Sequence, residues 1–307
     1  MIDFSKKPLF LAPLAGFSDL PLRSVVKKFG CDVTVSEMIS ANALVYESSD
    51  KTLEMLKKSP NEDPYVVQIA GSDIENLKKA VQIINKFDGI YGLDLNCGCP
   101  VPKVVRQGAG SALLNDLDKL QSIISAIKSV SNKKSLSVKF RLGFNDKNEE
   151  KIAKACEEAG ADYIAVHGRT RAGGYSAKVD YEAIARVKAS VKIPVVANGD
   201  INAQNADEIL NLTKCDALMI GRASIGNPWI FHEIKTKTSV DKALKQEIIL
   251  AHFDAMIEHY GEHGLCIFRK HLHQYSKGID GATTFRNDVN FIKDMAAMRE
   301  RIKEFFA

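Results

Sequence analysis

Residues 135–167 read SLSVKFRLGFNDKNEEKIAKACEEAGADYIAVH and contain the unit from which the remaining architecture can be worked out. The segments Ser135–Arg141 and Tyr163–His167 are short runs of the kind found in strands that are buried on both faces. Between them, Glu149–Ala159 has the apolar spacing of an amphipathic helix. A strand, a helix and a second strand in this order predict two parallel strands joined by a right-handed crossover.

The same alternation of strands and helices continues on both sides of this unit. Further strands are predicted at Leu9–Ala12, Val33–Ser36, Tyr65–Ile69, Gly92–Asn96, Pro194–Asn198 and Ala217–Ile220. Further helices are predicted at Asp73–Lys86, with Ser72 as the capping residue, and at Leu117–Val130 and Gln204–Leu212. Eight strands that alternate with helices predict an α/β protein whose parallel strands close into a (β/α)8 TIM barrel.

The C-terminal part of the chain has a different pattern. Residues 240–307 have helical spacing and little strand signal, which predicts a small all-α domain of three or four helices. We therefore divide the chain into a catalytic barrel, residues 1–239, and a helical domain, residues 240–307. No Pro-, Gly- or Ser-rich linker separates them, so the helices should pack firmly on the barrel. Residues 241–307 hold ten Lys or Arg and ten Asp or Glu, so charge alone does not predict RNA binding by this domain.

The composition is typical of a globular enzyme. The chain has 307 residues, of which 45% are hydrophobic and 26% are charged, with a net charge of +4. No apolar stretch approaches the roughly 18 residues that a membrane span needs, and the segment Met1–Lys7 lacks the pattern of a signal peptide. We therefore expect a cytoplasmic protein with no membrane association, no metal site and no implied protein partner.

Polar residues or glycines follow every predicted barrel strand. In a (β/α)8 barrel, the C-terminal strand ends and the loops after them form the active site. These positions hold Pro13-Leu14-Ala15-Gly16, Glu37, Gln68, Asn96-Cys97-Gly98-Cys99-Pro100, Lys139 with Arg141, His167-Gly168-Arg169, Asn198-Gly199-Asp200 and Gly221-Arg222. The sequence therefore predicts one polar site at the mouth of the barrel.

The last two strand ends have the features of a phosphate site. Barrels often bind phosphate with the loops after strands seven and eight, and Gly199 and Gly221 let backbone N–H groups approach an anion closely. Arg222 adds a planar, charged donor. The chain has no G-x-G-x-x-G motif, so a mononucleotide such as FMN fits better than a dinucleotide on a Rossmann-type domain. Gln68, Asn96 and Lys139 suit the polar edge of an isoalloxazine ring.

Cys99 is the candidate catalytic residue. It stands between Gly98 and Pro100 just after the fourth strand, in a turn that would present its side chain rigidly at the barrel mouth. A protonated thiol can act as a general acid in the reduction of an activated C=C bond, and a thiolate can act as a nucleophile. Cys97 is the rival candidate, because spacing alone does not decide which of the two thiols faces the site. The remaining cysteines are expected to be reduced and mostly buried.

Seven segments together resemble the tRNA-dihydrouridine synthases, and most closely their bacterial B-type branch. They are LAPLAGFSDLPLR (11–23), VSEM (35–38), VQIAGSD (67–73), LDLNCGCPVPKVVRQGAGSALL (93–114), VHGRTRAGGYS (166–176), VVANGDI (195–201) and DALMIGRASIGNPWIF (216–231). They occur in the family's order and at its spacing.

The resemblance implies an FMN enzyme that uses NADPH to reduce the C5–C6 double bond of a uridine in tRNA. The family motif N-x-G-C-P falls on residues 96–100, so Cys99 takes the role of the acid that protonates C5, while hydride from reduced FMN goes to C6. Cofactor contacts carry over to Pro13, Leu14, Ala15, Gln68, Lys139, His167, Asn198, Gly199, Asp200, Gly221 and Arg222. Substrate or tRNA contacts are expected at Asn96, Arg141, Arg169, Arg171, Lys270 and His271.

Two other functions are compatible with the residues. The first is an FMN-dependent reductase of a small molecule, either a free pyrimidine or an enone, on the same barrel. The second is an RNA-binding or RNA-folding protein whose flavin has no catalytic role. The first predicts turnover of free bases without tRNA, and the second predicts an effect on tRNA that survives loss of Cys99.

Overall fold

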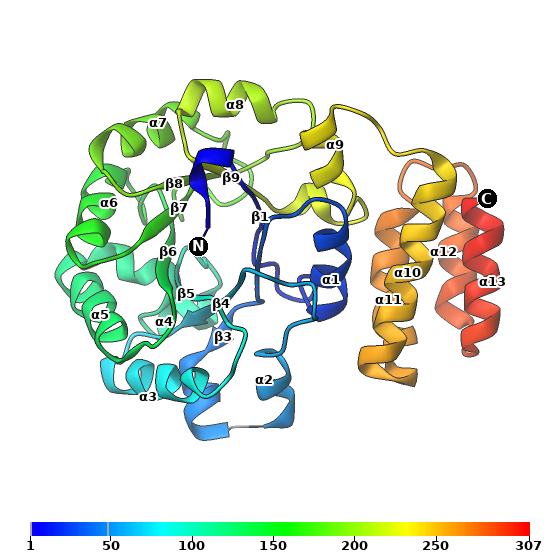
Figure 1. Cartoon of the computed structure of the whole chain (residues 1–307), viewed down its shortest axis with the longest axis horizontal. Helices are drawn as coiled ribbons and strands as arrows, with labels where there is room; N and C mark the ends of the chain where they lie inside the picture. The colour runs from blue at the N-terminus through cyan, green and yellow to red at the C-terminus, as the bar shows by residue number, and fades with distance from the viewer. Residues whose placement is uncertain (1, 48) are drawn as a thin grey trace.

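The computed structural model describes residues 2–47 and 49–307, which form a barrel flanked by a helical bundle (Figure 1). Within these residues, eight parallel strands close the barrel. They are β1 (Leu9–Leu11), β2 (Val33–Val35), β4 (Tyr65–Ala70), β5 (Gly92–Cys97), β6 (Ser135–Arg141), β7 (Tyr163–His167), β8 (Val195–Asn198) and β9 (Ala217–Ile220). The pairs β1–β9 and β2–β4 complete the ring, which confirms the predicted TIM barrel.

Each predicted strand lies within one residue of its observed bounds. One short strand was not predicted: β3 (Ile39–Ser40) pairs with the end of β4. Two residues are too few to show a period-2 pattern, so the sequence carries no signal for it.

Helices surround the barrel, and four of them, α3, α5, α6 and α8, lie at the predicted ranges. They are α1 (Leu20–Lys28), α2 (Asp50–Glu54), α3 (Ile74–Asn85), α4 (Pro102–Arg106), α5 (Leu117–Val130), α6 (Glu149–Glu158), α7 (Tyr181–Ser190), α8 (Ala206–Thr213) and α9 (Ile230–Thr236). The predicted cap of α3 was wrong. Asp73, not Ser72, caps the helix, because the Asp73 carboxylate accepts a hydrogen bond from the backbone N–H of Asn76 at 2.8 Å.

Apolar side chains form separate cores on the two faces of the barrel sheet. One face packs against the surrounding helices, and the barrel interior is filled by a smaller set that includes Phe10, Val66 and Val196. On β5, Leu93 and Leu95 belong to the outer core. Because strand residues alternate between faces, Asp94 and Asn96, which alternate with these leucines, face the barrel interior.

Four helices form the bundle beside the barrel, at the upper end of the predicted range of three or four. They are α10 (Lys242–Tyr260), α11 (Glu262–Tyr275), α12 (Ala282–Phe291) and α13 (Met295–Phe306). Their core also takes in Val25 of α1 and Trp229, just before α9. The Tyr260 hydroxyl donates to Asp19 at 3.2 Å, which adds a polar contact across the junction. The boundary at residues 239 and 240 stays a prediction.

No helix in residues 2–47 and 49–307 has both the length and the apolar character required to cross a bilayer.

Candidate active site

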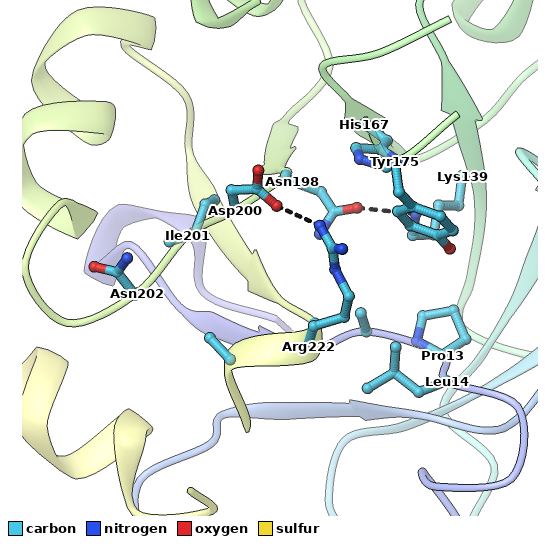
Figure 2. A pocket seen from close by; sticks show the side chains of 14 residues that line it. Pro13, Leu14, Lys139, His167, Tyr175, Asn198, Asp200, Ile201, Asn202 and Arg222 are labelled. Atoms are coloured by element: carbon cyan, nitrogen blue, oxygen red, sulfur yellow. Dashed lines mark hydrogen bonds and ion pairs between the residues drawn. The ribbon is translucent and has the colours of Figure 1, made fainter. Parts of the chain in front are cut away.

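A cavity of about 400 Å³ opens at the C-terminal ends of the barrel strands (Figure 2). It brings together nine of the residues that were predicted to bind the cofactor: Pro13, Leu14, Lys139, His167, Asn198, Gly199, Asp200, Gly221 and Arg222. The predicted residues Ala15 and Gln68 are not part of the lining. Ala15 is exposed in the loop after β1, and Gln68 lies fully buried on β4.

Lys139 is the cationic group contributed by β6. Its Nζ donates to Asn198 Oδ1 at 3.1 Å, and no second acceptor lies within hydrogen-bond distance among the described residues. Burial lowers the pKa of Lys139 to about 8. The ammonium therefore lines the cavity with unused donor capacity, which suits an electron-rich or anionic ligand.

Asp200 links two arginines on the opposite side of the cavity. Its carboxylate accepts from Arg169 and from Arg222, each at 2.5 Å, and the Arg169 hydrogen bond lowers the pKa of Asp200 (Figure 2 shows the Arg222 contact). The preceding Gly199 has φ +126°, and a Cβ at that position would lie 3.0 Å from Val179. Only glycine fits there without strain, which leaves the backbone of this loop open toward the cavity.

His167 is held in its neutral form. Burial lowers its pKa to about 2, with smaller contributions from Lys139, Arg141, Arg169 and Arg222. Its Nε2 lies 3.3 Å from Arg169 Nη1, so Nε2 accepts that hydrogen bond and the proton is assigned to Nδ1. A group with this pKa does not act as a proton donor near neutral pH.

Tyr175 was missed by the sequence reasoning and lines the cavity. The residue is 58% exposed, and the centroid of its ring lies 4.7 Å from Arg222 Cζ and 5.4 Å from Arg141 Cζ. This geometry is a cation–π arrangement with two guanidinium groups. The signal in the sequence was an aromatic residue directly after Gly173-Gly174, in a loop on the active-site face of the barrel.

Cys99 lies half-buried in the loop that follows β5 and is not part of the cavity lining. Its backbone N–H donates to Asn96 Oδ1 at 2.9 Å, and its carbonyl accepts from the Ser111 hydroxyl at 2.9 Å. Arg141 Nε donates to the Gly98 carbonyl at 2.8 Å. The thiol-bearing turn is therefore held by side chains from three directions.

Cys97 is distinguished from Cys99 by burial. It is fully buried in the core between the sheet and the helices, and burial raises its pKa well above the ordinary value. A thiol on this face of β5 does not reach the cavity, so the structure favours Cys99 as the functional cysteine.

The residues expected to contact RNA lie in different environments. Arg171 is half-buried with its guanidinium over the Phe144 ring at 4.7 Å. Lys270 lies over Phe17 at 5.3 Å and lines a second cavity, of about 700 Å³, between the barrel and the bundle. Arg141 is 2% exposed and donates to the carbonyls of Gly98, Thr170 and Gly174.

Like Arg141, two further residues of this set are buried, and a contact of these side chains with RNA stays a prediction. His271 is 1% exposed and packs edge-on against Phe17 and His252. Arg169 is 4% exposed and paired with Asp200. Both residues lie at positions where helix or loop periodicity alone does not reveal burial by a distant part of the chain.

Comparisons with known proteins identify the family of this chain. Residues 10–307 match the family model described as dihydrouridine synthase (Dus). The chain is 52% identical to a probable tRNA-dihydrouridine synthase from Helicobacter pylori strain J99, covering 99% of this chain and 94% of that protein. It is 38% identical to tRNA-dihydrouridine synthase B from Pseudomonas aeruginosa, covering 97% of this chain and 92% of that protein.

A solved structure, the old yellow enzyme homologue from Zymomonas mobilis, shares the barrel with a TM-score of 0.57 at 13% identity, covering 77% of this chain and 90% of that one. At this identity, the likeness supports the fold alone. The family match covers almost the whole chain, and the two relatives are similar to it over nearly their full lengths. This chain therefore belongs to the dihydrouridine synthase family.

Proposed function

We propose that this protein reduces the C5–C6 double bond of a specific uridine in tRNA to dihydrouridine, with FMN as bound cofactor and NADPH as reductant. Family membership and the names of the relatives support the reduction of uridine in tRNA. The observation that carries the proposal is the cysteine loop after β5. Arg141 donates to the Gly98 carbonyl of this loop and also lies over the ring of Tyr175, which lines the cavity together with Lys139 and Arg222.

The residues around this cavity fit FMN. Arg222 and the open backbone at Gly199 suit the phosphate, since a guanidinium and close backbone N–H groups are favoured partners of that group. Lys139 offers donors that are not used within the described protein. Bound FMN would supply the hydride chemistry, which no amino-acid side chain provides.

Asp200 has an indirect role in this proposal. A carboxylate repels phosphate, so Asp200 does not bind that group itself. Its contacts with Arg169 and Arg222 instead hold the Arg222 guanidinium beside the cavity. Asp200 therefore orients the phosphate-binding arginine.

Cys99 would deliver the proton to C5 of the uracil ring. Reduction of a C=C bond by hydride leaves the neighbouring carbon in need of a proton, and a positioned thiol can supply it. His167 is unsuitable because its pKa is lowered to about 2, and Cys97 is unsuitable because it is fully buried on the other face of β5. Cys99 is thus the acid that the geometry favours.

The target uridine must leave the tRNA stack to reach this cavity. The exposed ring of Tyr175 lies at the cavity and could stack on or guide an unstacked base. Lys270 and Arg171 are retained as candidate RNA contacts. The helical domain, residues 240–307, would recognise tRNA by its shape through phosphate and 2′-OH groups.

The test is to incubate the FMN-loaded protein with unmodified tRNA transcript and NADPH, and to map dihydrouridine by position. Cys99→Ala should abolish conversion, and Cys97→Ala should largely keep it, since Cys97 does not face the cavity. If NADPH reduces the bound flavin but no dihydrouridine forms, the assignment of tRNA as the substrate fails, and a reductase of a small molecule becomes the better hypothesis. If Cys99→Ala keeps full conversion, the proton-donor role is wrong.

A further inference from the structure

A chain of buried side-chain amides connects the barrel interior to the cysteine loop. Gln68 Nε2 donates to Asp94 Oδ2 at 2.7 Å, and Asn96 Nδ2 donates to Gln68 Oε1 at 2.7 Å. Asn96 Oδ1 then accepts from the backbone N–H groups of Gly98, at 3.2 Å, and Cys99, at 2.9 Å. Gln68 and Asp94 are register partners on the adjacent strands β4 and β5, so this chain of amides begins with two residues at the same level of the barrel.

The direction of every bond in this chain follows from the carboxylate at its start. An ionised carboxylate only accepts hydrogen bonds, so Gln68 must turn its NH2 group toward Asp94 and its oxygen toward Asn96. Asn96 must then turn its NH2 toward Gln68 and its oxygen toward the loop. With both amides reversed, Gln68 Oε1 would face the Asp94 carboxylate, and Asn96 Nδ2 would face two backbone N–H groups. The reversed arrangement is unfavourable at both ends of the chain.

Asp94 occupies an unusual place for a carboxylate. It is 3% exposed inside the barrel, where its neighbours include the apolar interior core, and burial raises its pKa. Its other oxygen accepts from the Ser137 hydroxyl at 2.6 Å. Desolvation of a buried carboxylate costs free energy, and the hydrogen bonds of Asp94 offset this cost only in part. Its position at the start of the amide chain gives Asp94 a further role, which is to orient the two amides.

We propose that Asp94 is a positioning residue for the reaction: it fixes the orientation of the Gln68 and Asn96 amides and thereby holds the Cys99 turn in its working geometry. The inference rests on the proposed function, in which Cys99 delivers a proton to the substrate. Among the described residues, Asp94 makes no hydrogen bond to Cys99 or to the cavity lining, and it acts on the turn through two intervening amides. Its charge also acts on Lys139.

The test compares three variants of the FMN-loaded protein. Asp94→Leu removes both acceptors at similar volume. Asp94→Asn removes the charge but keeps an acceptor for Gln68, and its NH2 can donate to the Ser137 oxygen. Ser135→Ala is the matched control, because Ser135 lies on the same face of β6 as Ser137 and its buried hydroxyl has no hydrogen-bond partner within the described part of the chain.

Three quantities are measured: flavin reduction by NADPH, dihydrouridine formation at saturating tRNA, and alkylation of Cys99 by iodoacetamide without RNA, followed by peptide mass spectrometry. Asp94→Leu should lower the turnover of tRNA about tenfold or more and raise the Cys99 alkylation rate about threefold or more, since the loop loses an oriented acceptor. Flavin reduction, compared at saturating FMN and slightly below pH 7 so that Lys139 stays protonated when the charge of Asp94 is lost, should change less than about twofold. Under these conditions Asp94→Asn and Ser135→Ala should resemble the wild type in all three.

Other outcomes overturn the inference. If Asp94→Leu leaves Cys99 alkylation unchanged, or lowers flavin reduction and tRNA turnover in parallel, Asp94 has only a general structural role. If Asp94→Asn is as impaired as Asp94→Leu, the charge matters and the amide orientation does not. Alkylation requires no RNA, so it tests the positioning of Cys99 even if the wild type forms no dihydrouridine, the result that would refute the proposed function.

Discussion

Lys139 shows at the scale of a single residue how burial sets chemistry in the cavity. Its side chain is buried at the mouth of the barrel, and this burial lowers the pKa of the ammonium to about 8. Asp94 opposes this effect through its charge. Near neutral pH, the protonated form therefore still predominates, and it is the form that favours an anionic ligand.

The affinity for FMN should consequently depend on pH through Lys139. A bound anion stabilises the ammonium, so binding takes up a proton above pH 8, and affinity should fall as pH rises, by at most about tenfold per pH unit. Measuring the Kd for FMN by fluorescence between pH 6.5 and 9.5 tests this. Lys139→Met should bind more weakly at pH 7 and show a flatter pH dependence. An equally steep dependence in this variant would assign the titration to another group.

At the scale of the secondary-structure element, side-chain alternation on β5 assigns the functional roles. Successive strand residues point to opposite faces, so Asp94 and Asn96 lie on the interior side, while Leu95 and Cys97 join the core under the helices. Cys99 does not follow this alternation, because the strand ends at Cys97 and a turn follows. The two thiols therefore differ in environment although they are only two residues apart.

The cap of α3 provides a prediction at this scale. Asp73→Ala removes the carboxylate that accepts from the Asn76 N–H, and should lower the free energy of unfolding by about 1 kcal/mol. Ser72→Ala is the neighbouring control. It loses only a hydrogen bond from its hydroxyl to the Gln107 carbonyl and should cost less than half as much. Chemical denaturation of both variants decides between the two caps; a larger effect of Ser72→Ala would contradict the assignment.

At the scale of the whole molecule, the bundle contains two buried imidazoles. His252 Nδ1 lies 2.8 Å from the Tyr275 hydroxyl, and its ring lies 4.6 Å from that of His271. Nε2 of both histidines is buried without a hydrogen-bond partner in the described structure. Burial lowers the pKa of His252 to about 3 and that of His271 well below its ordinary value, with Lys270 contributing to both.

These pKa values predict acid sensitivity. Both imidazoles are neutral in the folded protein and gain protons on unfolding below their ordinary pKa of about 6.5. The unfolded state then binds more protons, so stability is lost as pH falls from 6.5 toward 3. His252 accounts for about 1.4 kcal/mol of this loss at pH 5.5, and His271 adds to it in the same direction.

Urea denaturation at pH 7.5 and pH 5.5 measures this loss, with His271→Phe as the variant. An aromatic replacement should reduce the loss, while His263→Gln, at an exposed position in the same helix, should not. A wild-type stability that does not change between the two pH values would rule out the mechanism.

The sequence predicted most of the fold and the place of the site. The alternating strand and helix periods determined the barrel, because strands buried on both faces and amphipathic helices differ in their local patterns. The polar strand ends located the cavity, since all parallel strands point the same way. Nine predicted cofactor residues line it, including Lys139 and Arg222. Family motifs, read directly from the chain, identified the family.

Only the tertiary structure decided which side chains are accessible and which way they point. The burial of His271 and Arg169, the different burial of Cys97 and Cys99, and the amide chain that starts at Asp94 all depend on contacts between segments distant in sequence. Local periodicity reports which face of an element is apolar. It carries no information on which distant residue covers a given position, and solvent exposure, pKa and hydrogen-bond direction are determined by that neighbour.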